Sequence, residues 1–256
     1  MSGTLVITPT YNEADTLPSI AGRVLAQGAD LLVVDDNSPD GTGVIAEGLA
    51  ARDSRVHVLH RAGKEGLGTA YREGFAWGLA RGYDTLVELD GDGSHQPEQL
   101  GRLLDRMPVA DVALGSRWVD GGAVVNWPWR RALLSRAGSL YARVALGLPF
   151  RDVTGGYRAY SAQALRHIDL RSITSEGYCF QIDMLWHAQR AGLRVDEVPI
   201  TFVEREFGVS KMSSRIVREA ILNVTLCGLQ SLPSRIRAAL HPALPAASHR
   251  GPAHVS

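Results

Sequence analysis

Hydrophobic and polar positions alternate in a regular order through the first half of the chain. Short apolar runs, typical of buried strands, are each followed by a longer segment whose apolar residues have helical spacing. The predicted strands are 5–8, 31–35, 56–59, 85–89 and 109–114, and the predicted helices are 12 or 15 to about 26, 42–51, 66–81 and one from 97. Strands that alternate with helices form parallel sheets covered on both faces, so we expect an α/β fold with a mostly parallel, Rossmann-like sheet.

The alternation ends after residue 115, and the second half predicts a less regular arrangement. Two helices, a late strand and a tight glycine loop are predicted there, at 130–146, 179–191, 195–202 and 155–156. Segment 213–232 is apolar over much of its circumference and is predicted to be a C-terminal amphipathic helix. We expect one domain over 1–232. The stretch 233–256 has little to bury, so we expect a disordered tail there.

Composition narrows the class of protein. The formal net charge is zero with 45% hydrophobic and 21% charged residues, which gives no reason to expect a nucleic-acid partner. Cys179 and Cys227 lie far apart without metal-like spacing, so we expect buried thiols in a reducing compartment. The first residues lack the basic and apolar regions of a signal peptide, and no apolar segment is long enough to span a bilayer. These features predict a cytoplasmic protein.

Two acidic strand ends carry the clearest chemical signal. Asp90-Gly91-Asp92 follows one predicted strand, and Asp35-Asp36 ends another. Residues i and i+2 of a strand face the same way, so Asp90 and Asp92 are expected to point to one spot. Two carboxylates with room for water and phosphate suit Mg²⁺ or Mn²⁺. Open α/β sheets bind ligands outside the carboxyl ends of their strands, and two acidic ends therefore predict a site.

Other motifs at strand ends are open to two interpretations. Tyr11 and Glu13 follow the first strand and offer a ring and an acceptor to a nucleoside, but the same segment can simply begin a helix. Asp35 and Asp36 can likewise cap the next helix. The glycine loop at 64–69 presents backbone N–H groups to phosphate in some proteins. It is neither a Walker A motif nor GxGxxG, so a classical dinucleotide fold is disfavoured.

Six motifs occur in a fixed order along the chain. They are Pro9-Thr10-Tyr11-Asn12-Glu13, Val34-Asp35-Asp36-Asn37-Ser38-Pro39-Asp40-Gly41-Thr42, Asp90-Gly91-Asp92-Gly93-Ser94-His95, Gly115-Ser116-Arg117, Asp152-Val153-Thr154-Gly155-Gly156-Tyr157-Arg158 and Gly208-Val209-Ser210-Lys211. Together they resemble the polyprenyl-phosphate (dolichyl-phosphate) mannose synthases, which are family 2 glycosyltransferases of GT-A fold. The resemblance covers about residues 4–232, and the second motif is its most specific part.

The resemblance implies a role for each matching residue. It implies a metal and diphosphate site at Asp90 and Asp92, lined by Gly91. Ser94 falls where some relatives have a glutamine metal ligand, and serine is a weaker ligand. The residues of the nucleoside pocket would be Pro9, Tyr11, Glu13, Val34 and Asp36. Those near the acceptor phosphate would be Arg117, Arg131 and Ser135. A mobile loop closing over the diphosphates would carry the basic pair Arg205 and Lys211. Asp92, Arg117 and Arg131 are the catalytic residues on this interpretation, and His95 is expected to be structural.

The implied reaction is metal-dependent, inverting transfer of mannose from GDP-mannose to a polyprenyl monophosphate, giving the β-linked lipid phosphate and GDP. A phosphate monoester is largely ionised near neutrality, so it attacks without a strong general base. The nearest rival is UDP-glucose as the donor, since one sequence does not define a base pocket. A non-catalytic nucleotide-binding subunit is a second alternative. A nucleotidyltransferase is disfavoured, because 9–13 lacks a glycine- and lysine-rich triphosphate loop.

A polyprenyl acceptor lies in a bilayer, so the resemblance also implies contact with the cytoplasmic face of a membrane. Basic residues flank the apolar stretch 216–232, at Arg215, Arg218, Arg235 and Arg237, and Trp127 and Trp129 lie beside Arg130. Basic ends with an apolar middle fit an interfacial helix, but they also fit a helix of the core. Arg130 and Arg131 can equally form a solvated surface. A separate membrane-anchoring protein is a further hypothesis.

Overall fold

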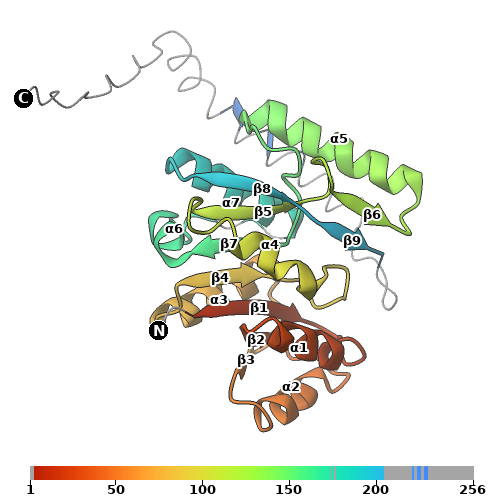
Figure 1. Ribbon diagram of the computed structural model, residues 1–256, viewed down its shortest axis with the longest axis vertical. Helices are drawn as coiled ribbons and strands as arrows, with labels where there is room; N and C mark the ends of the chain where they lie inside the picture. Colours follow the sequence, from red (N-terminus) through yellow and green to blue (C-terminus); the bar gives the residue numbers. More distant parts are fainter. Residues whose placement is uncertain are drawn as a thin grey trace, which may run out of the picture.

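The computed structural model describes residues 3–173, 175 and 177–204, and the five positions 221, 224, 225, 228 and 229. Arg205, Lys211, Cys227 and most of the predicted C-terminal helix lie outside the described residues, as does the predicted tail. The described chain is an α/β structure in which helices pack on both faces of a central sheet (Figure 1). This confirms the expected fold class.

Seven strands of the described residues form the central sheet, in the order β3-β2-β1-β4-β7-β5-β8. Their bounds are β1 (Thr4–Thr10), β2 (Asp30–Asp35), β3 (Val56–His60), β4 (Thr85–Glu88), β5 (Val112–Ser116), β7 (Arg158–Ser161) and β8 (Val195–Pro199). All are parallel except β7, which pairs antiparallel with both β4 and β5. The carboxyl ends of β1, β2, β4 and β5 therefore meet at one edge of the sheet.

The sequence pattern did not predict β7, because this strand has only four residues and follows an irregular loop. Its neighbours explain its position. Ala159 lies opposite Val87 of β4 on one side and Ala113 of β5 on the other. The short strand thus joins the N-terminal half of the sheet to the C-terminal half.

Successive strand residues point to opposite faces, which gives the sheet two apolar layers. Leu5 and Ile7 pack with helices α3, α6 and α7, whereas Val6 packs with α1, α2 and α4. The helix bounds are α1 (Leu17–Ala26), α2 (Thr42–Ala50), α3 (Leu67–Ala80), α4 (Leu100–Leu104), α5 (Trp129–Leu146), α6 (Ala162–His167) and α7 (Tyr178–Arg190), with a 3₁₀ turn η1 (Pro97–Gln99) before α4. Because both faces are covered, the strands read as near-continuous apolar runs.

The first helix begins later than the sequence predicts. Asn12 has a left-handed backbone (φ 60°), and α1 starts at Leu17, not at 12 or 15. The segment between them is a loop tied to the start of α2. The Glu13 amide donates to Thr42 Oγ1 at 3.0 Å, and the Ala14 amide donates to an Asp40 carboxylate oxygen at 3.1 Å. Because their amides bond to the start of α2, Glu13 and Ala14 do not extend helix α1 towards the N-terminus.

The predicted late strand is divided into two. β8 ends at Pro199, and β9 (Thr201–Val203) pairs with β6 (Ala123–Val125) in a separate two-stranded sheet. The amide of Ile200, between them, donates to the Ser116 carbonyl at 3.1 Å. The chain therefore leaves the central sheet at the end of β8 and continues beside β6 (Figure 1).

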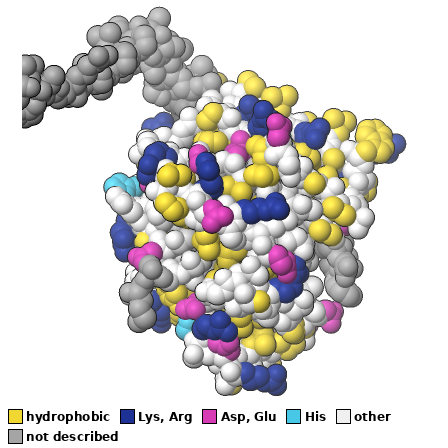
Figure 2. Space-filling view, viewed as in Figure 1, with side chains coloured by type: hydrophobic (Ala, Val, Ile, Leu, Met, Phe, Trp, Pro, Cys, Tyr) yellow, Lys and Arg dark blue, Asp and Glu magenta, His cyan; other side chains and the backbone are white. Residues whose placement is uncertain are grey.

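Helix α5 has an unusual distribution of side chains. Large hydrophobic side chains are exposed along it, with Trp129 70% and Val144 69% exposed. The others on this helix are Leu133, Leu134, Leu140 and Tyr141. In Figure 2, hydrophobic side chains gather at the upper right, over the region that α5 and β6 occupy in Figure 1. Within the described residues, no helix has the combined length and apolarity needed to cross a membrane.

Candidate active site

Asp90 and Asp92 lie in the loop after β4, which ends at Glu88. The strand alternation used to predict their common direction therefore does not apply, since both residues lie beyond the strand. The loop is instead fixed against the end of β1. A Cβ on Gly91 would lie 3.1 Å from the Pro9 carbonyl oxygen, and the Thr16 hydroxyl donates to the Gly91 carbonyl at 2.7 Å. The glycine thus permits the acidic loop to contact the segment that begins at Pro9.

Neighbouring polar groups orient the two carboxylates. The Tyr71 hydroxyl donates to Asp90 Oδ1 at 3.3 Å. The Ser94 hydroxyl and amide both donate to Asp92 Oδ1, at 2.5 and 3.0 Å. Ser94 is 1% exposed, and its hydroxyl hydrogen is directed at Asp92. In this structure Ser94 therefore acts on the predicted metal site by positioning Asp92.

His95 is buried beneath the acidic loop. Its ring lies between Tyr157, with centroids 5.3 Å apart, and Phe202, at 5.1 Å. Its Nδ1 is 3.5 Å from Asp90 Oδ2. Burial lowers the pKa of His95 to about 4, so the ring is neutral near pH 7. These contacts agree with the structural role expected for His95.

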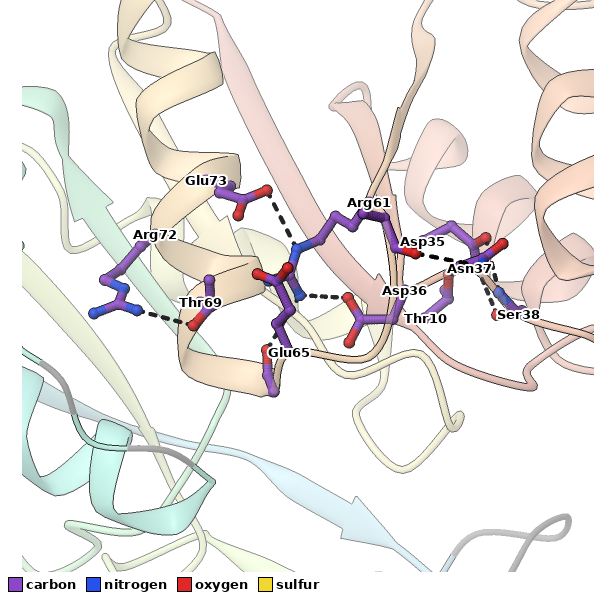
Figure 3. Close-up of polar contacts among 12 residues, drawn as sticks. Thr10, Asp35, Asp36, Asn37, Ser38, Arg61, Glu65, Thr69, Arg72 and Glu73 are labelled. Carbon is purple, nitrogen blue, oxygen red and sulfur yellow. Dashed lines mark hydrogen bonds and ion pairs between the residues drawn. The ribbon is translucent and has the colours of Figure 1, made fainter.

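The acidic end of β2 has a different partner for each aspartate. Asp35 is 2% exposed and accepts from the Thr10 hydroxyl at 3.0 Å and the Ser38 hydroxyl at 2.6 Å (Figure 3). Asp36 forms an ion pair with Arg61. Burial raises the pKa of the Asp36 carboxyl, and Arg61 opposes that rise in part. Asp35 thus holds the turn, while Arg61 holds Asp36.

Arg61 is a residue of the candidate site that the sequence did not reveal. It follows β3, its side chain is 2% exposed, and it pairs with Glu65 at 2.9 Å and Glu73 at 3.2 Å as well as with Asp36 (Figure 3). Beside it, the Lys64 ammonium lies 4.1 Å from the centre of the Tyr11 ring. The loop at 61–66 therefore lies directly beside the predicted nucleoside residues.

The remaining predicted nucleoside residues lie at the same edge with different exposures. Pro9 and Thr10 are the last residues of β1, opposite Val34 and Asp35 of β2. The Val34 side chain is fully buried in the core, so only its backbone can face a ligand. The structure thus brings Pro9 and Glu13 close to Gly91 of the acidic loop, and Tyr11 and Asp36 close to the loop at 61–66.

Arg117 lies just after β5, at the predicted edge, but its side chain is mostly buried. Its Nε and Nη2 donate to the two carboxylate oxygens of Asp152, both at 2.7 Å. Burial by itself would raise the pKa of the Asp152 carboxyl, but Arg117 holds that pKa below its usual value. Arg158, at the start of β7, donates to the carbonyls of Gly155, Val153 and Gln181.

Arg117 also lies at the centre of a cluster of aromatic rings. Its guanidinium carbon is 5.4 Å from each of three ring centres, those of Trp118, Trp127 and Phe202. Two further arginines join from α5. Arg131 lies 4.3 Å from the Trp127 ring centre, and Arg136 lies 4.6 Å from that of Trp118. We call these three arginines and three rings the arginine–aromatic cluster.

Arg131 and Ser135 share the inner face of α5, one turn apart. Arg131 forms an ion pair with Glu204, which directly follows β9. Ser139, a turn further, is 1% exposed, and its hydroxyl lies 3.5 Å from Thr154 Oγ1. Thr154 Oγ1 in turn accepts from Arg117 Nη2 at 3.0 Å. The N-terminal half of α5 therefore has polar groups facing inward and hydrophobic groups facing outward.

The donor set at the acidic loop fits a divalent cation that is shared with a ligand. Among the described residues there is no group of three or more His, Cys, Asp and Glu side chains able to hold a metal. Asp90 and Asp92 would supply two carboxylates. Mg²⁺ and Mn²⁺ commonly bind through one or two carboxylates, with water and substrate phosphates completing the shell. The residues present fit such a cation.

Comparisons with known proteins concern the chain as a whole. The model of "Glycosyl transferase family 2" matches residues 5–169. The chain is 58% identical over 238 residues to the "Undecaprenyl-phosphate mannosyltransferase" of Micrococcus luteus, covering 92% of this chain and 98% of the relative. It is 56% identical over 238 residues to the "Polyprenol monophosphomannose synthase" of Mycolicibacterium smegmatis, covering 91% and 90%.

Solved structures with the GT-A fold are also similar. One is glucosyl-3-phosphoglycerate synthase from Mycobacterium tuberculosis with Mn²⁺, UDP-glucose and phosphoglyceric acid, with a TM-score of 0.68 and 19% identity over 90% of this chain and 80% of that one. Another is the mannosyltransferase PcManGT from Pyrobaculum calidifontis with GDP-Man and Mn²⁺, with a TM-score of 0.51 and 15% identity over 95% and 77%. At these identities the similarity shows the fold. The family match and the two close relatives confirm the resemblance seen in the motifs, and this chain belongs to glycosyl transferase family 2.

Proposed function

We propose that this glycosyltransferase moves mannose from GDP-mannose to a polyprenyl monophosphate, releasing GDP. The observation that carries the proposal is the 58% identity, over 98% of its length, to a protein named undecaprenyl-phosphate mannosyltransferase. The second relative, at 56% identity, has a name that specifies the same sugar and the same kind of lipid. The family assignment makes the chain an enzyme, and it therefore argues against the alternative of a non-catalytic nucleotide-binding subunit.

The donor binds at the ends of β1, β2 and β4 in this proposal. Tyr11, Glu13 and Asp36 surround the nucleoside, and Asp90 and Asp92 face the diphosphate. Mg²⁺ or Mn²⁺ held there would supply the positive charge that stabilises the departing diphosphate. Ser94 keeps Asp92 in one orientation, and Tyr71 does the same for Asp90. Arg205 and Lys211 are proposed to add positive charge at the diphosphate.

The acceptor phosphate binds at Arg131 and Ser135 in this proposal. A guanidinium and a hydroxyl on one helix face match the oxygens of a phosphate monoester. Arg117 is proposed to contribute its charge from the arginine–aromatic cluster, in which Asp152 holds it in place. The ionised acceptor attacks the anomeric carbon from the side opposite the leaving diphosphate. A single displacement inverts that carbon, so an α-linked donor gives a β-linked product.

Membrane contact through α5 follows from the same arrangement. The phosphate of a polyprenyl chain lies at headgroup depth, so the residues around Arg131 must reach that depth. The outward face of α5 carries exposed Trp129, Leu133 and Val144. Exposed Arg130 lies 5.5 Å from the ring centre of Trp129. Apolar side chains, a tryptophan and a neighbouring cation are typical of a helix at a membrane surface. We propose peripheral association with the cytoplasmic face.

The proposal is tested with radiolabelled GDP-mannose, a polyprenyl phosphate and Mg²⁺ or Mn²⁺, with UDP-glucose in a parallel reaction. The expected result is a labelled, mild-acid-labile lipid from GDP-mannose, absent when EDTA is added. A product formed only from UDP-glucose would retain the reaction and reject mannose. If neither donor reacts, added membranes test the hypothesis of a membrane partner. If transfer is still absent, the proposed function is rejected.

A further inference from the structure

The ion pair between Arg131 and Glu204 places an anion on the arginine assigned to the acceptor. The two residues are distant in sequence and come from the first turn of α5 and the end of β9. Their side chains are 25% and 26% exposed, so solvent reaches both. The face of the Trp127 ring lies 4.3 Å from the Arg131 guanidinium carbon. The Glu204 carboxylate is thus bound to an arginine whose guanidinium lies against an aromatic ring, and such an arginine is suited to binding an anion.

Two unused hydrogen-bond donors lie in the same cluster. The indole nitrogens of Trp118 and Trp127 are buried and have no hydrogen-bond partner among the described residues. Buried donors usually have a partner, since an unpaired buried donor loses the hydrogen bonds that it makes to water in the unfolded chain. The Trp118 and Trp127 rings are 6.5 Å apart, and each contacts an arginine of α5. An anion that reached either indole nitrogen would give it an acceptor.

The backbone of Glu204 is fixed, although its side chain is partly exposed. The Glu204 amide donates to the Val125 carbonyl at 3.0 Å, which extends the β6–β9 pairing by one bond. One residue earlier, the Val203 amide donates to the Ser94 carbonyl at 3.0 Å. Ser94 is the residue that orients Asp92. Glu204 can therefore release Arg131 by a side-chain rotation, without moving the strand or the acidic loop.

We propose that Glu204 occupies the position of the acceptor phosphate at Arg131 and is displaced when the acceptor binds. The proposal rests on the proposed function, because it takes Arg131 as the acceptor site. It makes Glu204 a residue that sets the affinity of the acceptor site. A phosphate monoester has a charge of about −1.5 to −2 and three acceptor oxygens, whereas a carboxylate has one charge and two oxygens. Displacing Glu204 costs each anion the same free energy, so a fatty carboxylate, which binds Arg131 more weakly than the monoester, is left with very low affinity.

The test is a binding titration that needs neither donor nor metal. Farnesyl phosphate and farnesoate, which have the same chain and different headgroups, are titrated against the intrinsic tryptophan fluorescence of the protein. Glu204→Gln should lower the dissociation constant of farnesyl phosphate about twofold to fivefold, the range typical of a partly exposed ion pair. It should lower that of farnesoate by the same factor, because the gain is set by the fraction of protein in which Arg131 is open and not by the ligand.

The matched control is Asp196→Asn, which also removes a carboxylate paired with an arginine. Asp196 lies on β8, 2.6 Å from Arg106, outside the candidate site. Its variant should bind both probes like the wild type. In transfer assays Glu204→Gln should lower the acceptor KM and leave the GDP-mannose KM unchanged.

Unchanged or weaker binding of farnesyl phosphate by folded Glu204→Gln would overturn the proposal, and would make Glu204 a residue that merely positions Arg131. If this variant does not fold, Glu204→Asp decides. Its shorter side chain weakens the pair, so tighter farnesyl phosphate binding supports displacement and weaker binding overturns it. Because binding is measured without transfer, a failure of the proposed mannose reaction is seen separately.

Discussion

The two sides of the candidate site are built in different ways. The donor side consists of the ends of β1, β2 and β4 with their loops. Near neighbours in sequence hold some of its carboxylates, and the others bond to groups from the adjacent strands or from helix α3. Asp35 is held by Ser38, for example, and Asp92 by Ser94. The acceptor side joins β5, β6, α5 and β9. There Arg131 meets Glu204, and Arg117 meets Asp152.

The difference shows which parts of a site local sequence can specify. A strand end and the turn after it form a unit of a few residues, so motifs such as Asp35–Thr42 record the donor side directly. The arginines of the acceptor side have ion-pair partners 35 and 73 residues away in the sequence. Variants on the two sides should therefore affect different kinetic and thermodynamic quantities.

The largest expected effect is on the donor side. Asp92→Ala should lower kcat for transfer by about 10³-fold, because the charge on the departing diphosphate loses its main stabilisation. Far-UV circular dichroism and the urea midpoint should remain close to those of the wild type, since Asp92 is on a loop. Asp105→Ala, an exposed aspartate just after α4, serves as the control. Metal-dependent activity near the wild-type level would reject the role of Asp92.

The next effect is on stability at the acceptor side. Asp152→Asn leaves Arg117 buried without its charged partner and should lower the free energy of unfolding by about 3–5 kcal/mol. Urea denaturation measures this loss. The exposed pair of Arg106 and Asp196 offers a comparison, because Asp196→Asn should cost less than about 1 kcal/mol. Equal losses in the two variants would show that burial of the Asp152 pair has no energetic consequence.

A third variant separates the two sides kinetically. Arg131→Ala should raise the acceptor KM about tenfold or more, as expected when a charged hydrogen bond to substrate is lost, and leave the donor KM unchanged. Arg130→Ala, the exposed neighbour, should change neither KM with a short-chain soluble acceptor. Steady-state kinetics with each substrate varied in turn provide the test. An unchanged acceptor KM and kcat in Arg131→Ala would remove this residue from the acceptor site.

The smallest expected effect lies outside both sides and sets a baseline. His187 Nδ1 is 3.2 Å from Asp183 Oδ1, and this hydrogen bond raises the pKa of His187 above 6.5. The stabilisation is complete below pH 6.5 and is lost as the pH rises through the folded-state pKa. His187→Gln should remove this dependence, which amounts to less than about 1 kcal/mol. Thermal unfolding between pH 5.5 and 8.5 measures it, and identical pH profiles would contradict the assignment.

The regular half of the fold was predictable because its signals are local. The parallel strands β1 to β5 appeared as apolar runs, and the acidic motifs marked their carboxyl ends. The predicted start of α1 was wrong. Asn12 has a left-handed backbone, and the amides of Glu13 and Ala14 bond to Thr42 and Asp40 at the start of α2, which sequence spacing does not reveal.

The remainder depended on contacts that only the folded chain makes. Arg61 follows β3 without any motif around it, yet it holds Asp36 through an ion pair. Tyr71 lies on the inner side of α3 like any core residue, and only its hydroxyl reaches Asp90. Glu204 adjoins a predicted strand and has no pattern that links it to Arg131. The sequence also leaves open why residue 68 is a glycine. A Cβ there would lie 2.7 Å from the Ser175 carbonyl oxygen, so close packing accounts for the glycine without a bound phosphate.

The position of β7 has a consequence for synthesis on the ribosome. This strand lies between β4 and β5 in the sheet but follows both in the chain. Until residues 158–161 have emerged, β4 and β5 each present an unpaired edge, and such edges are sites of misassembly. The joining of β4 to β5 must therefore wait for a segment made more than 40 residues after β5 begins. Fragments that stop before β7 should be the ones most prone to aggregate.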